Sequence, residues 1–479
     1  MAGARTVFVS GIFNVVHPGH MRLLRFAKEL GDTLVVGVLS DELAGSAASV
    51  RFDDRLDGVS SLRFVDSTLV VARPVSEVIA ELKPDIVVKG REHAQQWNEE
   101  EQAVQAYGGR LLFGSGTSFL DSDDLISREV KGLDYQHISA PRTFMNRHDI
   151  SAQRLMDILD QFSQRKVVVV GDVIVDEFVS CHALGMSQED PTVVVTPVDS
   201  ERFLGGAGIV AAHAVGLGGR AVLHTVVGED EAAGYLVEAL GEYGVTSHLL
   251  VDESRPTTRK QRFRAGGKTL LRVSYLQQDP IAASLQEQMS IAIEQQLADA
   301  DLLIFSDFNY GCLPQGVVDR VIASAREAGT LIVADSQSSS QVGNVARFKG
   351  ADLITPTERE ARLATRNGDD GLVVLADQLR ELADSQLVFL TLGSDGVLVR
   401  GQDHDNVPAT TDQIEALNRR PVDVSGAGDS LLVTSALALT CGATSMEAAV
   451  LGSIAAAIQV ARIGNTPLLL TELQGVLQR

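Results

Sequence analysis

Short apolar runs alternate with amphipathic stretches along the first quarter of this 479-residue chain. The runs that are typical of buried strands are TVFVSGIF (6–13), TLVVGVLS (33–40), STLVVA (67–72), DIVVKG (85–90) and GRLLFGSG (109–116). Between them, residues 20–30 and 75–83 repeat apolar positions at helical spacing. Strands that alternate with helices form a parallel sheet, which binds ligands at the carboxyl ends of its strands. The pattern therefore predicts an α/β domain.

The rest of the chain repeats the alternation and predicts a second, larger α/β domain. A helix is expected over 151–164, and strands are expected over 166–178, 300–308, 329–336, 351–357 and 387–399. In the segment 257–276 residues alternate around Gly266 and Gly267, which predicts a hairpin in a small separate sheet. The expected boundaries are 1–135 for the first domain, 136–150 for a linker without clear periodicity, and 151–479 for the second domain.

The charge of the chain restricts its partners. It has 41 basic and 63 acidic residues, a formal net charge of −22, which argues against a nucleic-acid or membrane partner. The three cysteines are far apart and lack metal-site spacing, which suits a reducing cytoplasm. No signal peptide is expected, and the Ala-rich stretch 448–464 is short for a membrane span and predicts a buried helix.

Two histidines, His17 and His20, stand in the predicted strand-to-helix turn of GIFNVVHPGH. Backbone N–H groups at a helix N-terminus favour an anion. Imidazole N–H groups can stabilise charge at the α-phosphate of a nucleoside triphosphate and on the leaving pyrophosphate. Two other interpretations stay open, a metal-binding pair and a plain helix start with Pro18 in its first turn.

A second turn, in DVSGAGDS, places glycines between a strand and a long apolar helix. Gly426, Ala427 and Gly428 can direct three backbone N–H groups at a transferred phosphoryl group. Asp429 follows them and is positioned to take a proton from an attacking hydroxyl. The alternative is a glycine turn in which Asp429 is an ordinary acidic residue of the first helical turn.

The stretches GIFNVVHPGH, AKELGDTLVVGVLSD and KPDIVVKG resemble the cytidylyltransferase-like nucleotidyltransferase family over residues 6–130. The resemblance implies a Rossmann-like domain whose nucleoside triphosphate is surrounded by Gly11, Phe13, His17, Gly19 and His20, with Lys89 reaching phosphate. Two features depart from the family. Asn14 replaces an Asp, and Asp123 and Asp124 stand where hydroxyl side chains are usual.

The stretches GDVIVDEF, GGAGIVAAHAVGLGG, TLGSDG and DVSGAGDS resemble the ribokinase-like (PfkB) sugar kinase family over residues 165–472. The resemblance implies an α/β domain with a small β-sheet lid, ATP as co-substrate and Mg²⁺ as cofactor. The residues that it implies are Asp176, Gly205 and Gly206 for the sugar, Thr391, Gly393 and Gly396 for ATP, and Glu360, which acts on magnesium through water. Ile209 and Thr357 replace two Asn residues that are usual in the family.

The pair of domains resembles the bifunctional heptose 7-phosphate kinase and heptose 1-phosphate adenylyltransferases of ADP-heptose synthesis, in reversed order. The resemblance implies phosphorylation of a sugar phosphate at its anomeric position and nucleotidyl transfer to a sugar 1-phosphate, in a cytoplasmic homodimer or larger homo-oligomer. Basic residues crowd the predicted hairpin, and a sugar phosphate is a natural partner for Lys260 and Arg262. A kinase for an unphosphorylated sugar and a regulatory sugar-binding protein with degenerate sites stay open as alternatives.

Overall fold

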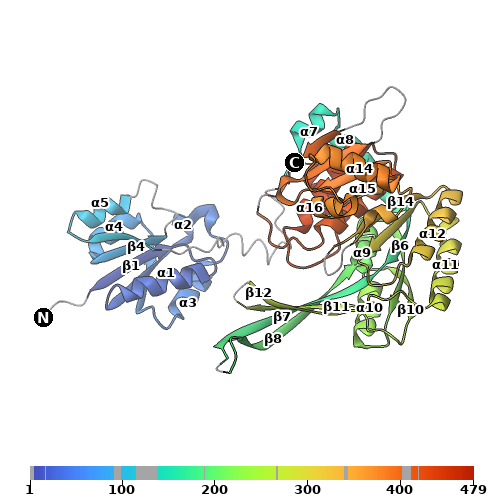
Figure 1. Ribbon diagram of the computed structural model, residues 1–479. Coiled ribbons are helices and arrows are strands. Elements are labelled where there is room, and N and C mark those ends of the chain that lie inside the picture. Colours follow the sequence, from blue (N-terminus) through green and yellow to red (C-terminus); the bar gives the residue numbers. More distant parts are fainter. Residues whose placement is uncertain are drawn as a thin grey trace. The chain divides into compact units, whose positions relative to one another are not determined.

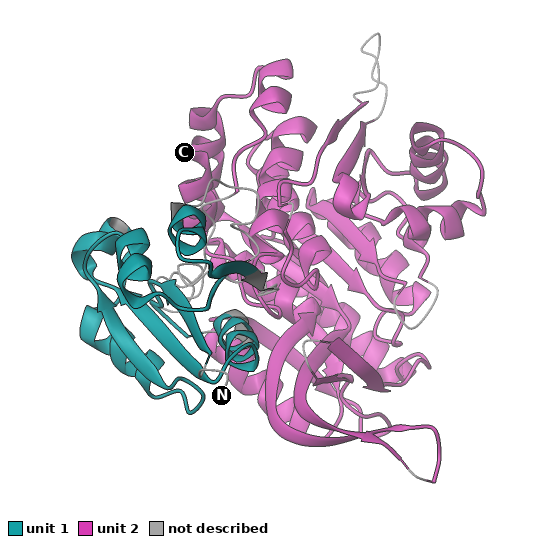
Figure 2. Cartoon of the chain, turned by 90° about the vertical axis from the view of Figure 1, so that its left-hand side faces the viewer, with its two compact units in different colours: residues 1–134 teal, residues 135–479 magenta. Residues whose placement is uncertain are grey.

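The computed structural model describes residues 5–16, 18–90, 99–114, 138–187, 189–265, 268–338, 343–401, 411–418 and 420–478. The chain divides into two compact units, residues 1–134 and residues 135–479, which Figure 2 shows in teal and magenta. Each unit has hydrophobic clusters of its own, so each is described separately.

Unit 1 is built on a five-stranded parallel sheet in the order β3-β2-β1-β4-β5. The strands are β1 (Thr6–Gly11), β2 (Thr33–Leu39), β3 (Ser67–Val71), β4 (Ile86–Gly90) and β5 (Arg110–Gly114). The helices are α1 (Pro18–Glu29), α2 (Asp41–Ala44), α3 (Phe52–Ser60), α4 (Val75–Leu82) and α5 (Glu99–Gln105). In β1, Val7 and Val9 belong to one hydrophobic cluster and Phe8 to another, because both faces of the sheet are covered.

Unit 2 contains a nine-stranded sheet in the order β10-β9-β6-β13-β14-β15-β16-β17-β18, of which the last two strands run antiparallel to their neighbours. Its strands are β6 (Lys166–Gly171), β9 (Arg220–Val227), β10 (Thr246–Val251), β13 (Leu302–Asp307), β14 (Leu331–Ser336), β15 (Leu353–Ile354), β16 (Leu387–Thr391), β17 (Val397–Gly401) and β18 (Thr411–Ile414). The predicted strand over 387–399 is therefore a hairpin of β16 and β17.

Helices cover this sheet and form most of the core of unit 2 (Figure 1). They are α7 (Arg142–Arg147), α8 (Ala152–Leu159), α9 (Ala207–Gly216), α10 (Glu231–Glu242), α11 (Ala283–Leu297), α12 (Gln315–Ala328), α13 (Glu358–Thr365), α14 (Leu372–Ala383), α15 (Ala427–Thr440), α16 (Ser445–Gln459) and α17 (Leu470–Leu477). The Ala-rich stretch forms the buried helix α16, as predicted. Among the described residues, no helix is both long and apolar enough to span a membrane.

A separate four-stranded sheet, the lid sheet, has the order β12-β11-β7-β8 (Figure 1). It consists of β7 (Val173–Met186), β8 (Val193–Gly206), β11 (Arg259–Ala265) and β12 (Lys268–Tyr275). The hairpin of β11 and β12 confirms the predicted small sheet, although its turn at Gly266 and Gly267 lies outside the described residues.

The prediction of one strand over 166–178 was wrong, because β6 and β7 belong to different sheets. The chain changes direction at Asp172, whose side chain accepts hydrogen bonds from the backbone N–H groups of Phe308, Tyr310 and Cys312. These donors lie more than 130 residues away in sequence, so the apolar pattern of the strand could not reveal the break.

Part of the expected linker is packed into unit 2. Residues 142–147 form helix α7, and Phe144 and Met145 are buried in the same hydrophobic cluster as α8 and α9. The side chains of Arg147 and His148 both contact Oδ2 of Asp412, in the last strand of the main sheet, at 2.8 Å. Residues 138–150 are thus part of the fold of unit 2.

Candidate functional site

Asp429 lies in the first turn of α15, directly after the glycine turn. Gly426 caps this helix with a φ of 76°, and a Cβ atom there would collide with Asn465 Oδ1. A Cβ atom on Gly428 would have no neighbour within 4 Å among the described atoms. The first helical N–H groups therefore adjoin open space, as an anion site at a helix N-terminus requires.

Asp429 is buried with Asp176 and Lys260 in electrostatic range. Burial, followed by the charge of Asp176, raises the pKa of Asp429 to about 7, although the charge of Lys260 opposes this shift. Gln337 Nε2 lies 3.4 Å from Asp429 Oδ1. The structure therefore brings together three residues that the sequence analysis placed in one site, from β7, β11 and α15.

Asp176, on β7, is buried and incompletely paired. Its Oδ1 atom lies 3.3 Å from Arg262 Nη2, yet among the described residues it accepts no hydrogen bond. Burial raises the pKa of Asp176, while the charges of Arg262 and Lys260 oppose that shift. Buried polar atoms without partners are rare and costly, so this oxygen is suited to a ligand hydroxyl.

The glycine pair at the end of β8 leaves room for the side chain of Asp176. A Cβ atom on Gly205 would lie 2.5 Å from Asp176 Oδ2, and Gly206 has a φ of 56° and packs against the backbone oxygen of Asp172. Any larger residue at Gly205 would displace the Asp176 side chain. Ile209, four residues into the same segment, is fully buried in the hydrophobic core of unit 2.

Two cations of β11 complete this cluster. Lys260 Nζ lies 4.7 Å from the ring centroid of Phe308 and 5.1 Å from that of Tyr310, which are cation–π distances. Arg262 donates a hydrogen bond to Ser425 Oγ at 3.2 Å, directly before the glycine turn. Both cations therefore face the Asp176 and Asp429 side of the lid sheet.

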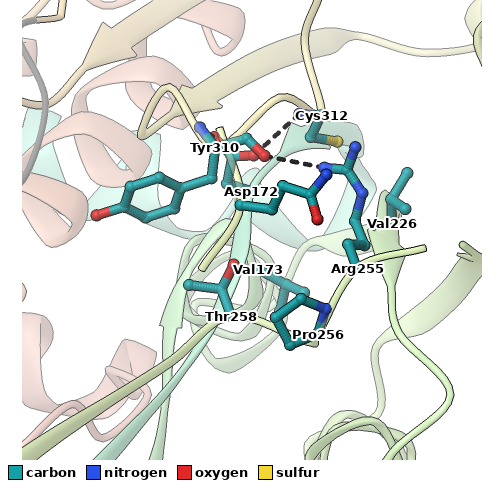
Figure 3. Close-up of a pocket in the computed structure, with 9 residues that line it drawn as sticks. Asp172, Val173, Val226, Arg255, Pro256, Thr258, Tyr310 and Cys312 are labelled. Atoms are coloured by element: carbon teal, nitrogen blue, oxygen red, sulfur yellow. Dashed lines mark hydrogen bonds between the residues drawn. The ribbon is translucent and has the colours of Figure 1, made fainter. Parts of the chain in front are cut away.

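Figure 3 shows a small pocket next to Tyr310. The ring of Tyr310 is one of the two aromatic rings that Lys260 contacts. Asp172, Arg255, Tyr310 and Cys312 line it, and the guanidinium group of Arg255 donates to the backbone oxygen of Tyr310. In Figure 3 the ring of Tyr310 points away from Cys312 and Arg255. Burial, followed by the charge of Asp307, raises the pKa of Asp172 to about 6. Hydrogen bonds to Asp172 and Arg255 thus hold the loop 308–312, which carries the two aromatic rings that contact Lys260.

Both carboxylate oxygens of Glu360 accept hydrogen bonds within the protein. It forms a capping box with Thr357 at the start of α13, where its Oε2 accepts from the backbone N–H and the hydroxyl of Thr357, each at 2.8 Å. Its Oε1 accepts from the backbone N–H of Ser338 at 2.7 Å. Thr357 thus serves as the helix N-cap in place of the Asn that is usual in the family.

Sequence reasoning missed Asp335, at the carboxyl end of β14. Burial, followed by the charges of Glu360 and Asp429, raises its pKa well above the ordinary value for aspartate. Asp307 stands at the corresponding end of β13, and its charge acts in the same direction. Aspartates at the ends of adjacent parallel strands could have identified this region. Within the described residues, no three His, Cys, Asp or Glu side chains are arranged to hold a metal ion.

The predicted ATP residues Thr391, Gly393 and Gly396 follow β16. The backbone N–H and hydroxyl of Thr391 both donate to the backbone oxygen of Pro356. Gly396, with a φ of 92°, packs against the backbone of Ile414, while a Cβ atom on Gly393 would face open space. Among the described residues, no hydrogen bond or ion pair joins this loop to Asp429.

The candidate site of unit 1 follows β1. His20 Nδ1 lies 3.1 Å from the backbone oxygen of Val15, and the His20 ring packs edge-on against Phe13 with centroids 5.0 Å apart. Phe13 is buried and has a φ of 56°, and a Cβ atom on Gly11 would touch its ring. These contacts hold His20 in the first turn of α1.

The structure describes only some of the other residues predicted for this site. Gly19 lies in the first turn of α1, whereas His17, Asp123 and Asp124 lie outside the described residues. Lys89, near the end of β4, donates to Glu100 Oε1 at 2.8 Å, so an anionic ligand would have to compete with this carboxylate.

Asn14 has a structural role that explains why it is not Asp. Its Nδ2 donates to the backbone oxygen of Ala47 at 2.7 Å, and its Oδ1 accepts from the N–H groups of Ser49 and Val50. A carboxylate could accept these two hydrogen bonds but could not donate the third.

We expect Asn14→Asp to destabilise unit 1 by about 1–3 kcal/mol, since a charge would face the Ala47 oxygen without a donated hydrogen bond. Chemical denaturation of the full chain, followed by hydrogen exchange in residues 5–60, measures this change. Asn14→Ser, which is neutral and can still donate, is the matched comparison. Equal stability of wild type and Asn14→Asp would contradict the assigned role.

The fold and the clustered residues define unit 2 as an α/β domain with a separate lid sheet and buried carboxylates at the N-terminus of α15, and unit 1 as an α/β domain with a parallel sheet. Residues 164–471, more than half of the chain, match the pfkB family of carbohydrate kinases, and residues 8–125 match the cytidylyltransferase-like family. The chain therefore belongs to the pfkB carbohydrate kinase family, and it carries a cytidylyltransferase-like domain. Both resemblances seen in the sequence are confirmed.

The chain is also similar to curated bifunctional proteins. The chain is 33% identical over 320 residues to the bifunctional protein HldE of Bradyrhizobium diazoefficiens, a match that covers 65% of the chain and 63% of the relative. It is 34% identical over 324 residues to the HldE protein of Caulobacter vibrioides, with coverage of 65% and 63%. The matches thus span slightly less than two thirds of the length of these relatives. Here the cytidylyltransferase-like region comes first, in the reverse of the order that the resemblance implies for the bifunctional enzymes.

Solved structures share the fold. Phosphofructokinase-2 from Escherichia coli in complex with substrates and products aligns with a TM-score of 0.55 at 16% identity, over 66% of this chain and 98% of that one. Ribokinase from Arabidopsis thaliana with ribose and ATP aligns with a TM-score of 0.52 at 17% identity, over 66% and 99%. At these identities the likeness establishes the fold alone.

Proposed function

We propose that the chain is a bifunctional enzyme of sugar-nucleotide synthesis. Unit 2 transfers the γ-phosphoryl group of ATP to the anomeric hydroxyl of a sugar phosphate, with heptose 7-phosphate as the candidate acceptor. Unit 1 transfers a nucleotidyl group, with adenylyl as the candidate, to a sugar 1-phosphate and releases pyrophosphate. The observation that carries the proposal is the buried Asp429 beside Asp176 and Lys260, at the N-terminus of α15.

In the proposed kinase reaction Asp176 binds the acceptor sugar and Asp429 accepts the proton of its anomeric hydroxyl. The sugar oxygen forms a bond to the γ-phosphorus, the bond from that phosphorus to the β–γ bridging oxygen breaks, and ADP leaves. The N–H groups at the start of α15 stabilise the negative charge of the transferred group. Lys260 adds positive charge on the acceptor side, within electrostatic range of Asp429.

Magnesium would neutralise the β- and γ-phosphates when it is bound with ATP. The buried carboxylates of Asp335 and Glu360 fit a role near this ion, because their negative charges already interact unfavourably with each other. Both carboxylate oxygens of Glu360 accept hydrogen bonds from Thr357 or Ser338, which favours contact through water. We expect the phosphates and water to supply most ligands of the ion.

In the proposed nucleotidyl transfer His20 binds phosphate. A backbone oxygen only accepts hydrogen bonds, so Nδ1 of His20 must be the donor toward Val15. The ring can then donate from Nε2 only as the imidazolium cation, whose charge complements that of the α-phosphate region. The N-terminus of α1 adds backbone N–H groups, which favour an anion.

A product assay tests both activities. The full chain is incubated with Mg²⁺, ATP or CTP, and a panel of sugars and sugar phosphates, and the products are identified by mass spectrometry. We expect a 1,7-bisphosphate from heptose 7-phosphate and, from heptose 1-phosphate, a nucleotide sugar with pyrophosphate. If no sugar is phosphorylated, a regulatory sugar-binding protein becomes the better description.

The kinase activity should rise with pH through about 7. Asp429 accepts a proton only when it is deprotonated, and burial holds its pKa near 7 in the free protein. We therefore expect kcat/KM for the acceptor to increase tenfold per pH unit below this value and to level off above it. Measuring kcat/KM from pH 5.5 to 8.5 tests this expectation. A profile that is flat across pH 7 would contradict the role of Asp429 as the base.

A further inference from the structure

The basic hairpin of the lid sheet sorts its cations onto two faces. Alternate residues of a strand point to opposite faces, and β11 pairs with β7 in parallel so that Lys260 lies opposite Asp176 and Arg262 opposite Phe178. Arg264 shares that face and stacks over the Phe178 ring at 5.4 Å. The intervening residues of β11 face the other side, where Arg259 and Gln261 contact Glu177.

Arg272, on β12, adds a further cation to the face that carries Asp176. It lies directly opposite Arg262 in the antiparallel pair of β11 and β12, and directly opposed side chains share a face. The charge of Arg272 also acts on the carboxylate of Asp176. Two like charges are therefore held opposite each other beside the proposed acceptor site.

Two of these cations form no ion pair among the described residues. Arg262 lies 3.3 Å from Asp176 Oδ1. Within the described ranges, however, neither Arg264 nor Arg272 forms an ion pair, although the chain has 63 acidic and only 41 basic residues. Like charges directly opposite each other destabilise a sheet. Asp176 is the carboxylate beside this opposed pair, and it leaves Arg264 and Arg272 without an ion-pair partner among the described residues. These two arginines are therefore suited to an anionic ligand.

The spacing along β11 places these arginines at increasing distances from Lys260. Lys260 is within electrostatic range of Asp429. A strand rises about 3.3 Å per residue, so Arg262 and its partner Arg272 lie roughly 7 Å further along, and Arg264 roughly 13 Å. An anion at this distance belongs to the far end of an acceptor whose reacting hydroxyl lies at Asp429.

We propose that Arg264 and Arg272 bind the phosphate group that the acceptor sugar already carries, and thereby select phosphorylated over unphosphorylated sugars. Planar guanidinium groups match phosphate oxygens with paired hydrogen bonds. This inference rests on the proposed kinase function and extends it to the recognition of the acceptor.

The test compares Arg264→Gln, Arg272→Gln and the double variant with wild type, in the full chain. We expect KM for heptose 7-phosphate to rise about tenfold in each single variant and about a hundredfold in the double variant. The kcat, the KM for ATP and the rate with unphosphorylated heptose should each stay within about twofold of wild type. Arg259→Gln, on the opposite face of the same strand, is the matched control and should leave KM unchanged.

A second measurement does not depend on activity. Inorganic phosphate or heptose 7-phosphate should raise the melting temperature of the wild type but not that of the double variant. If the Gln variants do not fold, Arg264→Lys and Arg272→Lys keep the charge without the paired donors and should show a smaller rise in KM.

The possible outcomes separate the inference from the proposed function. An unchanged KM for heptose 7-phosphate in the double variant overturns the inference alone, and so does a rise confined to the KM for ATP. If the wild type phosphorylates no sugar, the proposed kinase function fails. The melting experiment then decides separately whether these arginines bind phosphate.

Discussion

Replacing Asp429 by Asn should lower kinase turnover at least about a hundredfold, since general-base contributions are of this order. Asn has nearly the same shape but cannot accept the proton of the attacking hydroxyl. The glycine turn and the first N–H groups of α15 stay in place, so ATP should still bind. Single-turnover phosphorylation of heptose 7-phosphate, together with ATP binding by calorimetry, measures the two effects separately.

The stability of this variant provides its control. The pKa of Asp429 in the folded state is raised to about 7. The contribution of Asp429 to the stability of the fold is therefore fully present below the pKa of the unfolded state and is lost as the pH rises through about 7. Asn does not titrate, and Asp429→Asn should therefore melt at an equal or higher temperature than wild type at pH 8. Near-normal turnover in this folded variant would remove Asp429 from the mechanism.

The sequence predicted the strands of unit 1 closely because buried parallel strands are short, continuous apolar runs. The structure ends β1 at Gly11 and β2 at Leu39, within one or two residues of the expected ends. The same criterion failed at Asp172, where an apolar run continues although the chain passes into another sheet. That break depends on backbone donors of residues 308–312, which no local pattern contains.

In the candidate site, too, the sequence predicted some residues and could not predict one that depends on contacts between distant elements. The family resemblance implied Asp176, the glycine turn indicated Asp429, and the basic hairpin indicated Lys260 and Arg262. The structure brings these four side chains together from three elements. The sequence could not identify Asp335, whose perturbation depends on burial and on the charges of carboxylates from other elements. Sequence motifs thus predict which residues lie at the ends of strands, whereas burial in the folded protein determines the pKa values of these residues.

Departures from a family pattern also need the structure before they are interpreted. On sequence alone, Asn14 and Thr357 favoured a degenerate protein. In the structure Asn14 holds residues 47–50 through three hydrogen bonds, and Thr357 caps α13. Ile209 is part of the core. Each replacement has a structural role, so none of them by itself indicates a lost activity.

Nucleotidyl transfer should fall at least about a hundredfold in His20→Ala, because removal of one donor that stabilises transition-state charge typically has an effect of this size. Pyrophosphate release from ATP and heptose 1-phosphate measures this loss, and phosphorylation of heptose 7-phosphate by the same preparation is the internal control.

His20 also supports the turn through its hydrogen bond to Val15 and its contact with Phe13, so loss of activity alone could reflect a displaced turn. His20→Asn separates these two roles. The Asn amide can donate to the Val15 oxygen, but it has no ring nitrogen that could bind phosphate as a cation. If His20 binds phosphate, the Ala and Asn variants should be equally inactive while the kinase activity is retained. Recovery of nucleotidyl transfer in the Asn variant would restrict His20 to supporting the turn, and parallel loss of both activities in folded protein would contradict two separate sites.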